Sequence, residues 1–267
     1  MLDAQGGRDP SKIFLSSDVA LKLRTHTGLL ACTSMAESSS RHHLPGFDTA
    51  LDSLRTDLVL MGNLVSRNFG NARAGFVRRA EDFCAAVVAD DEEVDVLERQ
   101  INRLGVDILM RFQPMVTDLR ETIGSVKYGF LLERISDYAA LIGRRTRKLI
   151  QETDVEEAAA LNPVFEEVQE LLGDALRSFS RAELGLAESV RSRTDRCAEK
   201  ARSRVDEYTD LVEDRPHLAR AYVNLMSIAQ ALEEICYLCG NISEEAIYIA
   251  EARDLRHAGN RLLEGNE

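Results

Sequence analysis

Two pairs of carboxylates stand four residues apart in segments whose other residues repeat with helical period. Asp91 and Asp95 belong to the string DDEEVD, and Glu133 and Asp137 belong to LLERISDYA. Residues four apart project from the same side of an α-helix, so each pair presents two carboxylates together. Clustered carboxylates repel one another unless a cation compensates them, and oxygen ligands suit multivalent cations. The spacing therefore makes these four residues candidate metal ligands.

A simpler interpretation is that the acids face solvent or pair with arginines such as Arg99 and Arg134, which is the commoner situation for a single helix pair. The second half of the chain favours the metal site, because it repeats the pattern. Asp195 and Glu199 stand four apart in DRCAE, and Glu233 lies in ALEEI, 100 positions after the matching LLERI.

The helix that carries the second acidic pair has a regular apolar stripe. Its members follow one another in steps of 3 and 4: Leu119, Ile123, Val126 and Phe130. The same steps continue to Glu133 and Asp137. We expect this stripe to face the interior, which places the two acids at positions that the pattern assigns to buried apolar residues.

Two further helices precede this one. The first has a packing seam at Phe47, Leu51, Leu54, Leu58, Met61 and Val65, and the second has a stripe at Val94, Leu97, Ile101, Leu104 and Ile108. We expect Gly70 and Gly75 to bracket the turn between them. Pro114 requires the second helix to end before it, and the third helix follows.

The same order of three helices begins again after the string QETDVEEAAALNP. The fourth helix is indicated by apolar steps of 3 and 4 at Phe165, Val168, Leu172, Ala175 and Phe179. The fifth contains Val190, Ala201, Val205 and Tyr208, and we expect the last to run from about Leu218 to Leu263. Alternation with period two is absent. The sequence predicts an all-α fold of two tandem homologous antiparallel three-helix bundles, at 47–153 and 154–267.

Residues 1–46 lack this periodicity, and we expect a poorly ordered tail. Because an ordinary start before a first helix follows Met35, we also hypothesise that translation begins there.

Composition excludes several classes of function. The chain has 267 residues and a net charge of −12, so a nucleic-acid-binding surface is not expected. No apolar run is long enough to cross a membrane and no signal peptide is apparent, which favours the cytoplasm. Five cysteines without regular spacing indicate reduced thiols, and we expect Cys236 and Cys239, a lone CxxC, to be small core residues rather than a metal or redox site.

Three strings follow one another in the first half, VADDEEVD, RFQPMVTDLR and LLERISDYA, and LEEICYLCGNISE lies near the end of the second half. In order and spacing the first three resemble the motifs of the PhoU family of phosphate-signalling regulators, and the last resembles the ending of that family's second repeat. The resemblance runs from Phe47 onward. The resemblance implies two three-helix repeats whose acidic pairs bind multinuclear metal clusters. All four first-repeat acids match. In the second repeat Glu233 matches, Tyr237 replaces the following Asp, and Asp195 and Glu199 are offset by one residue.

We therefore expect one competent cluster in the first repeat and a weakened or absent one in the second. Iron, zinc, manganese, magnesium and calcium all accept oxygen ligands, so the metal stays open. The resemblance further implies a homodimeric, non-enzymatic adaptor between the ATPase of a phosphate ABC transporter and a sensor histidine kinase, acting as a negative regulator. A divergent accessory of another phosphate transporter is the nearest alternative. A carboxylate-bridged metalloenzyme is less favoured, because His217 and His257, the histidines beyond the tail, lack the Glu-x-x-His motif of di-iron bundles.

Overall fold

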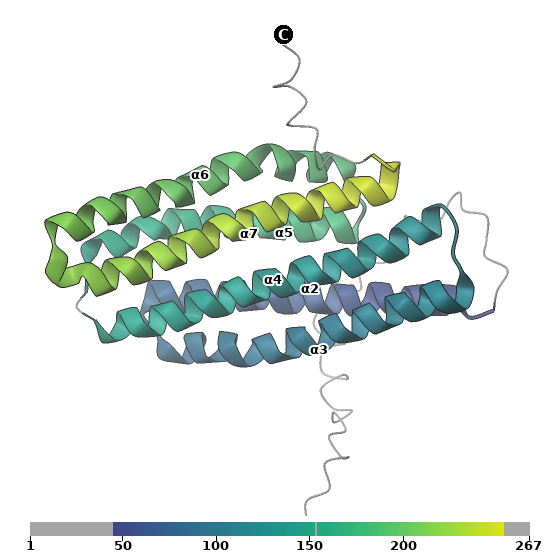
Figure 1. Cartoon of the computed structure of the whole chain (residues 1–267), viewed down its shortest axis with the longest axis horizontal. Coiled ribbons are helices and arrows are strands. Elements are labelled where there is room, and N and C mark those ends of the chain that lie inside the picture. Colours follow the sequence, from purple (N-terminus) through teal and green to yellow (C-terminus); the bar gives the residue numbers. More distant parts are fainter. Residues whose placement is uncertain (1–44, 153, 254–267) are drawn as a thin grey trace, which may run out of the picture. The chain divides into compact units, whose positions relative to one another are not determined.

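Six long helices make up the part of the chain that this computed structural model describes, residues 45–152 and 154–253 (Figure 1). The first three are α2 (Phe47–Arg78), α3 (Glu81–Phe112) and α4 (Thr117–Gln151). A 3-10 turn at Glu156–Leu161 leads to α5 (Asn162–Ser180) and α6 (Leu184–Asp214), and a second at Pro216–Leu218 leads to α7 (Ala219–Glu251). No strand occurs in these residues, which confirms the expected all-α fold with two sets of three helices. The predicted tail and start at Met35 concern residues 1–44, outside this part.

Five of the six described helices end where the backbone becomes left-handed or where proline follows, and α4 ends where Glu152 becomes extended. Arg79, Gln113 and Ala182 have φ of 51°, 45° and 52°, values that an α-helix cannot continue. Pro114 follows the end of α3 and Pro216 follows the end of α6. Proline lacks the backbone N–H and its ring clashes with the preceding turn, so both helices stop before it. For Pro114 this is the end that the sequence predicts.

The turn expected between Gly70 and Gly75 does not form, because α2 continues to Arg78. Gly75 serves close packing instead. A Cβ at this position would lie 2.7 Å from Cys84 Sγ, at the start of α3. The expected end of the last helix near Leu263 is also wrong, since α7 ends at Glu251 and Ala252 is left-handed with φ of 59°.

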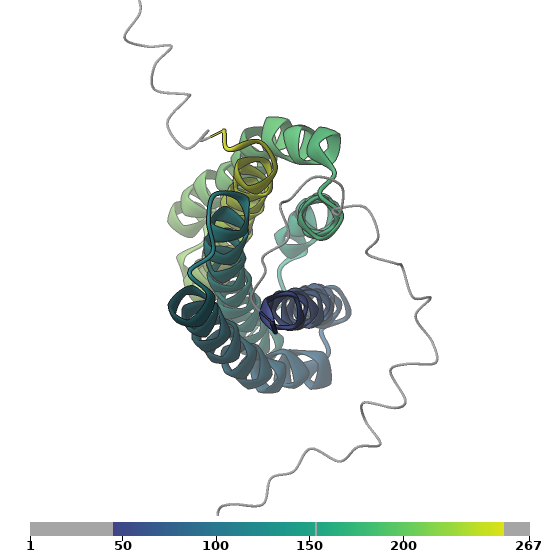
Figure 2. The same ribbon diagram turned by 90° about the vertical axis from the view of Figure 1, so that its right-hand side faces the viewer.

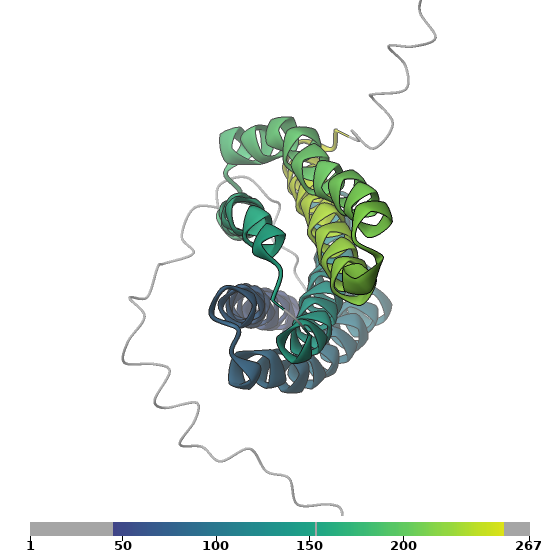
Figure 3. The ribbon, with the colours of Figure 1, turned by 90° about the vertical axis from the view of Figure 1, so that its left-hand side faces the viewer.

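Four of the helices lie side by side in the order α3, α4, α7, α6, and α2 and α5 cover one face of this layer (Figures 2 and 3). The core runs between the two layers and is shared by both repeats. Phe165 on α5 contacts Phe69 and Phe76 on α2, with ring centroids 6.0 and 5.0 Å apart. The uncovered side of the four-helix layer is called the outer face below.

The stripe expected to be the inner side of α4 lies on the outer face. Leu119, Ile123 and Phe130 are 37%, 38% and 55% exposed. The side of α4 that packs inward includes small residues, among them Gly124, Ser125, Gly129, Ser136, Ala139 and Gly143. Small residues let α4 approach three neighbouring helices closely, but they carry a weaker apolar signal than the larger residues of the outward stripe. Hydrophobic size alone therefore gave the wrong direction for this helix.

No helix in the described ranges is both long and apolar enough to cross a membrane.

Candidate metal centre

The four first-repeat acids gather where α3 and α4 run beside each other on the outer face. Asp91 and Asp95 come from α3, and Glu133 and Asp137 come from α4. Glu133 and Asp91 are half-buried, whereas Asp95 and Asp137 are exposed. The expectation that Glu133 and Asp137 occupy the buried side of their helix is therefore wrong, because the whole stripe to which they belong faces outward.

Glu133 has the most perturbed protonation in this cluster. Burial is the largest cause that raises its pKa, from 4.5 to about 7, and the negative charges of Asp137, Asp95, Glu98 and Asp91 raise it further in that order. The four predicted residues are thus close enough to act on one another electrostatically. A carboxyl whose pKa is raised toward neutrality by burial and by neighbouring acids is typical of a functional site.

A chain of hydrogen bonds from the core fixes Asp91. The buried Asn68 on α2 donates from Nδ2 to Ser136 Oγ on α4 at 3.1 Å, and Ser136 Oγ donates to Asp91 Oδ1 at 2.7 Å. The pKa of Asp91 is raised overall, with burial as the largest cause. The hydrogen bond from Ser136 and the charge of Arg144 oppose this shift, and the neighbouring aspartates add to it. Three helices therefore determine where this carboxylate points, as the hydrogen-bond partners of metal ligands do in metal sites.

Glu98 is a member of the cluster that the sequence prediction missed. It is half-buried on α3 and acts electrostatically on Glu133. The signal was available, because Glu98 lies three residues after Asp95 and seven after Asp91, on the same side of the helix.

The alternative of ion pairing does not hold for these acids. No ion pair within the described ranges joins any of the four to Arg99, Arg134 or another cation. Nor do three Asp, Glu, His or Cys side chains in this part of the chain converge to form a ready-made metal site. Asp95 and Asp137 are exposed and can change rotamer without movement of the helices. The ligand chemistry suits a hard cation, because all four side chains offer oxygen and a cation would relieve their repulsion, but Asp95 and Asp137 would have to rotate toward the other two to complete a site.

The corresponding place in the second repeat contains an arginine. Arg202 on α6 donates to Glu233 Oε1 from Nη2 at 2.6 Å and from Nε at 2.9 Å. It also donates from Nη1 to Glu199 Oε2 at 3.1 Å and from Nη2 to the Tyr237 hydroxyl at 2.6 Å. The protein thus supplies its own counter-cation to these acids, so they do not fit a metal.

The two repeats differ here by a reversal of charge. Arg202 faces Glu233 in the second repeat, and Glu98 acts on Glu133 in the first. The two residues hold the same place in their helices. Glu98 lies seven residues after Asp91 and three after Asp95, and Arg202 lies seven residues after Asp195 and three after Glu199. Asp195 is exposed. The prediction of a weakened second cluster thereby gains a physical reason, which the offset of one residue had not supplied.

The cysteines of the CxxC string lie in the core, as expected. Cys236 and Cys239 are both fully buried. The nearest thiol to Cys236 is that of Cys197 on α6, with the two Sγ atoms 3.2 Å apart. Burial is the largest cause that raises the pKa of Cys239 above its ordinary range, which makes its thiol inert.

Comparison with known proteins identifies the family. The model of the PhoU domain matches residues 58–146 and 161–246. Proteins named phosphate-specific transport system accessory protein PhoU, or its homolog, are similar to this chain. The one from Pseudomonas putida is 29% identical over 84% of this chain and 88% of its own length, and the one from Escherichia coli K12 is 24% identical over 84% and 95%.

Solved structures agree with this assignment. The crystal structure of PhoU from Pseudomonas aeruginosa superimposes with a TM-score of 0.75 at 27% identity, over 78% of this chain and all of that one. The fold is also that of the phosphate transport system regulatory protein PhoU from Streptococcus pneumoniae, with a TM-score of 0.71 at 20% identity over 78% of this chain and 99% of that one. With both domain matches covering the two sets of three helices, the chain belongs to the PhoU family.

Proposed function

We propose that this protein is a regulatory accessory protein of phosphate uptake that links the ATPase of a phosphate ABC transporter to a sensor histidine kinase. In this role it keeps the phosphate-starvation response off while phosphate is sufficient. It acts in the cytoplasm as a homodimer, without enzymatic activity. The observation that carries the proposal is the family match over both repeats, together with relatives named as accessory proteins of phosphate-specific transport.

The proposal includes a multinuclear cluster of divalent or trivalent cations at the first repeat, with iron, zinc, manganese or magnesium as candidates. Asp91, Asp95, Glu133 and Asp137 would hold it, with Glu98 beside them. A cation supplies positive charge, and no catalytic step is required of it. The raised pKa of Glu133, to about 7, supports this, because a cation would remove the repulsion that contributes to the shift.

One observation favours a second candidate, a divergent accessory of another phosphate transporter without a kinase partner. Arg202 and Tyr237 replace acidic chemistry in the second repeat with an internal ion pair and a phenol. A partner that recognises two metal-bearing surfaces would meet only one here.

The two candidates differ in their partners, which can be identified in the native host. A tagged full chain expressed at its own locus is purified from cells grown in phosphate excess, and the bound proteins are identified by mass spectrometry. Recovery of both the transporter ATPase and a histidine kinase supports the adaptor. Recovery of the ATPase without a kinase supports the second candidate, and recovery of neither contradicts both.

A deletion strain tests the direction of regulation. The adaptor predicts that a phosphate-starvation reporter becomes active in phosphate-rich medium when the gene is deleted, and that the full chain restores repression. A reporter that stays silent after deletion would contradict the negative role.

A further inference from the structure

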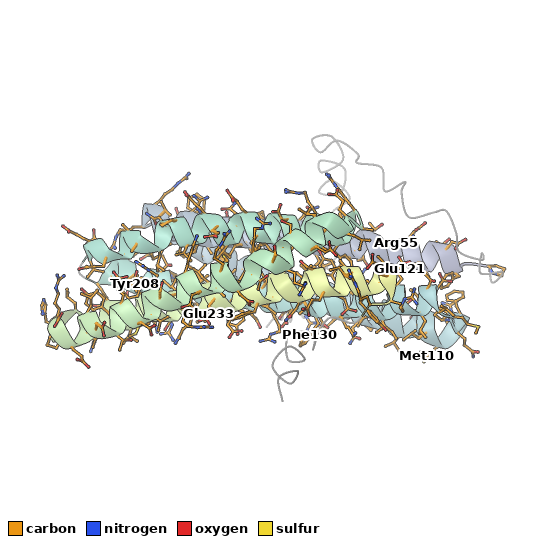
Figure 4. The ribbon with its side chains drawn as sticks, turned by 90° about the horizontal axis from the view of Figure 1, so that it is seen from above. Arg55, Met110, Glu121, Phe130, Tyr208 and Glu233 are labelled. Atoms are coloured by element: carbon orange, nitrogen blue, oxygen red, sulfur yellow. The ribbon has the colours of Figure 1, made fainter. Side chains whose placement is uncertain are left out.

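The outer face carries an apolar strip that no helix of the described chain covers. On α4 it consists of the exposed Leu119, Ile123 and Phe130, with Val126 half-buried between them against α3. The helix α3 and the following loop add the exposed Val106, Met110, Met115 and Val116. Met110 and Phe130 are 65% and 55% exposed. Figure 4 shows both on the same side of the helices. Contiguous apolar residues at such exposure are unusual on a soluble surface and mark interaction sites.

The spacing of the strip is that of a helix-packing seam. Leu119, Ile123, Val126 and Phe130 step by 4, 3 and 4 along α4. Such steps place side chains in a row that a second helix packs against. The strip thus has the spacing of a helix–helix contact, but no helix of the described residues packs on it.

The strip leads into a groove with acidic walls. A groove of about 630 Å³ lies over Val126, Phe130 and Leu131, with Glu98 on the α3 side and Glu245 and Tyr248 on the α7 side. Glu245 is 7% exposed and pairs with Lys127 at 3.3 Å, and Lys127 also lies over the Tyr248 ring at 5.4 Å. The groove combines an apolar floor and an aromatic wall with acids at its margins.

The second repeat does not repeat this surface. The positions 100 residues after the four α4 residues are Ala219, Val223, Met226 and Gln230. They include a small residue and a polar one, and no aromatic ring stands where Phe130 stands. The apolar row on α4 is therefore a feature of the first repeat that the second repeat does not share.

From these features we infer that the groove between α3 and α7 over α4 binds an amphipathic helix of another protein, with its apolar side on Ile123, Val126 and Phe130 and with a lysine or arginine beside Glu98, since Lys127 already neutralises Glu245. Helix-in-groove recognition uses an apolar row at these steps, and complementary charge fixes the partner's orientation. This goes beyond the proposed function, because it does not require a cation at the first repeat.

A second copy of this chain is the less favourable occupant. The chain carries a net charge of −12, and symmetric pairing through α4 would bring the acidic margins of one groove toward those of the other. Like charges placed together across an interface oppose association. A homodimer of this protein therefore uses a different surface.

The probe is a synthetic helical peptide of about 18 residues, long enough for about 27 Å of helix. It has leucines in steps of 3 and 4 and lysines elsewhere, and a second peptide keeps the leucines and has glutamates in place of the lysines. Fluorescence anisotropy measures the binding of each to the full chain. The expected result is saturable one-to-one binding of the lysine peptide and no binding of the glutamate peptide.

Matched variants localise the binding. Ile123→Glu with Phe130→Glu is expected to weaken binding of the lysine peptide at least tenfold. Val59→Glu with Leu60→Glu, at positions 50% and 45% exposed on α2, adds the same charge and is expected to leave binding unchanged. Circular dichroism checks that both remain folded, and Phe130→Ser provides a milder change.

Three outcomes overturn the inference. Equal binding to both charge variants shows attraction to the acidic chain as a whole. Equal binding of the two peptides removes the basic requirement. A dimer in sedimentation that Ile123→Glu with Phe130→Glu makes monomeric shows that a second copy occupies the groove. The variant Glu133→Gln with Asp137→Asn separates this inference from the cation proposal, because it is expected to retain peptide binding within about threefold even where it loses metal.

Discussion

Replacement of Glu133 by glutamine tests the electrostatic account of the first-repeat cluster through stability. In the folded protein burial and the neighbouring acids raise the pKa of this carboxyl from 4.5 to about 7. The folded state therefore holds more protons than the unfolded state between these two values, so stability falls as the pH rises through this window. The difference corresponds to an upper limit of about 3.4 kcal/mol, which partial exposure of the side chain reduces to about 1 kcal/mol.

Glutamine has the same shape without the charge, so the variant lacks this penalty. In cation-free buffer we expect Glu133→Gln to be more stable than the parent by about 1 kcal/mol at pH 8 and equally stable at pH 4.5. Urea unfolding followed by circular dichroism measures the free energy of unfolding at each pH. Glu93→Gln, at an exposed position on the same helix α3, removes one charge outside the cluster and is the control for the loss of a charge. A difference between parent and Glu133→Gln that is constant from pH 4.5 to 8 would show that the carboxyl is not strained in the folded protein.

Two further predictions concern the packing of α3 on α4 and a buried hydrogen bond. A Cβ at Gly105 would lie 2.2 Å from Val126 Cγ2. Gly105→Ala is therefore expected to push α3 from α4 and to destabilise the fold by about 1–3 kcal/mol. The control is Gly70→Ala, which has open space around it in α2 and is expected to stabilise the fold by up to about 1 kcal/mol. The buried Tyr208 hydroxyl donates to the Glu157 carbonyl oxygen at 3.0 Å, so Tyr208→Phe is expected to cost about 1 kcal/mol. Thermal unfolding measures all three, and an unchanged melting temperature for Gly105→Ala would contradict the close helix contact.

Helical period identified which residues share a side of a helix, but it could not give the direction of that side. The row from Leu119 to Asp137 does share one side of α4, as predicted, and that side faces outward. The inward side needs glycine, serine and alanine so that α4 can approach its neighbours, and these residues contribute little to a hydrophobic pattern. Direction depends on packing between distant segments, which a single sequence does not display.

The glycines show the same limit. Gly70 lies in open space inside α2 and Gly75 lies against Cys84, although both look like turn residues in the sequence. Only the path of α3 distinguishes a glycine that permits close packing from one that ends a helix.

The acidic cluster was predictable in part. The i, i+4 spacing found Asp91, Asp95, Glu133 and Asp137, which the structure places within electrostatic reach of one another. It missed Glu98 and Arg202, although each lies three residues after its acidic pair and so could have been placed on the same side of the helix from the sequence. Which residue of the facing helix each one meets could not have been predicted, because that depends on how the helices pack.

Elemental analysis of bound cations is the most direct test of the claim that the first repeat binds metal and the second does not. The full chain is loaded with iron, zinc, manganese or magnesium in turn, freed of excess by gel filtration, and measured for bound metal per chain. Glu133→Gln with Asp137→Asn is expected to abolish the bound metal, whereas Glu199→Gln with Glu233→Gln is expected to leave it unchanged. Bound metal that survives the first pair of substitutions would show that the cation binds elsewhere.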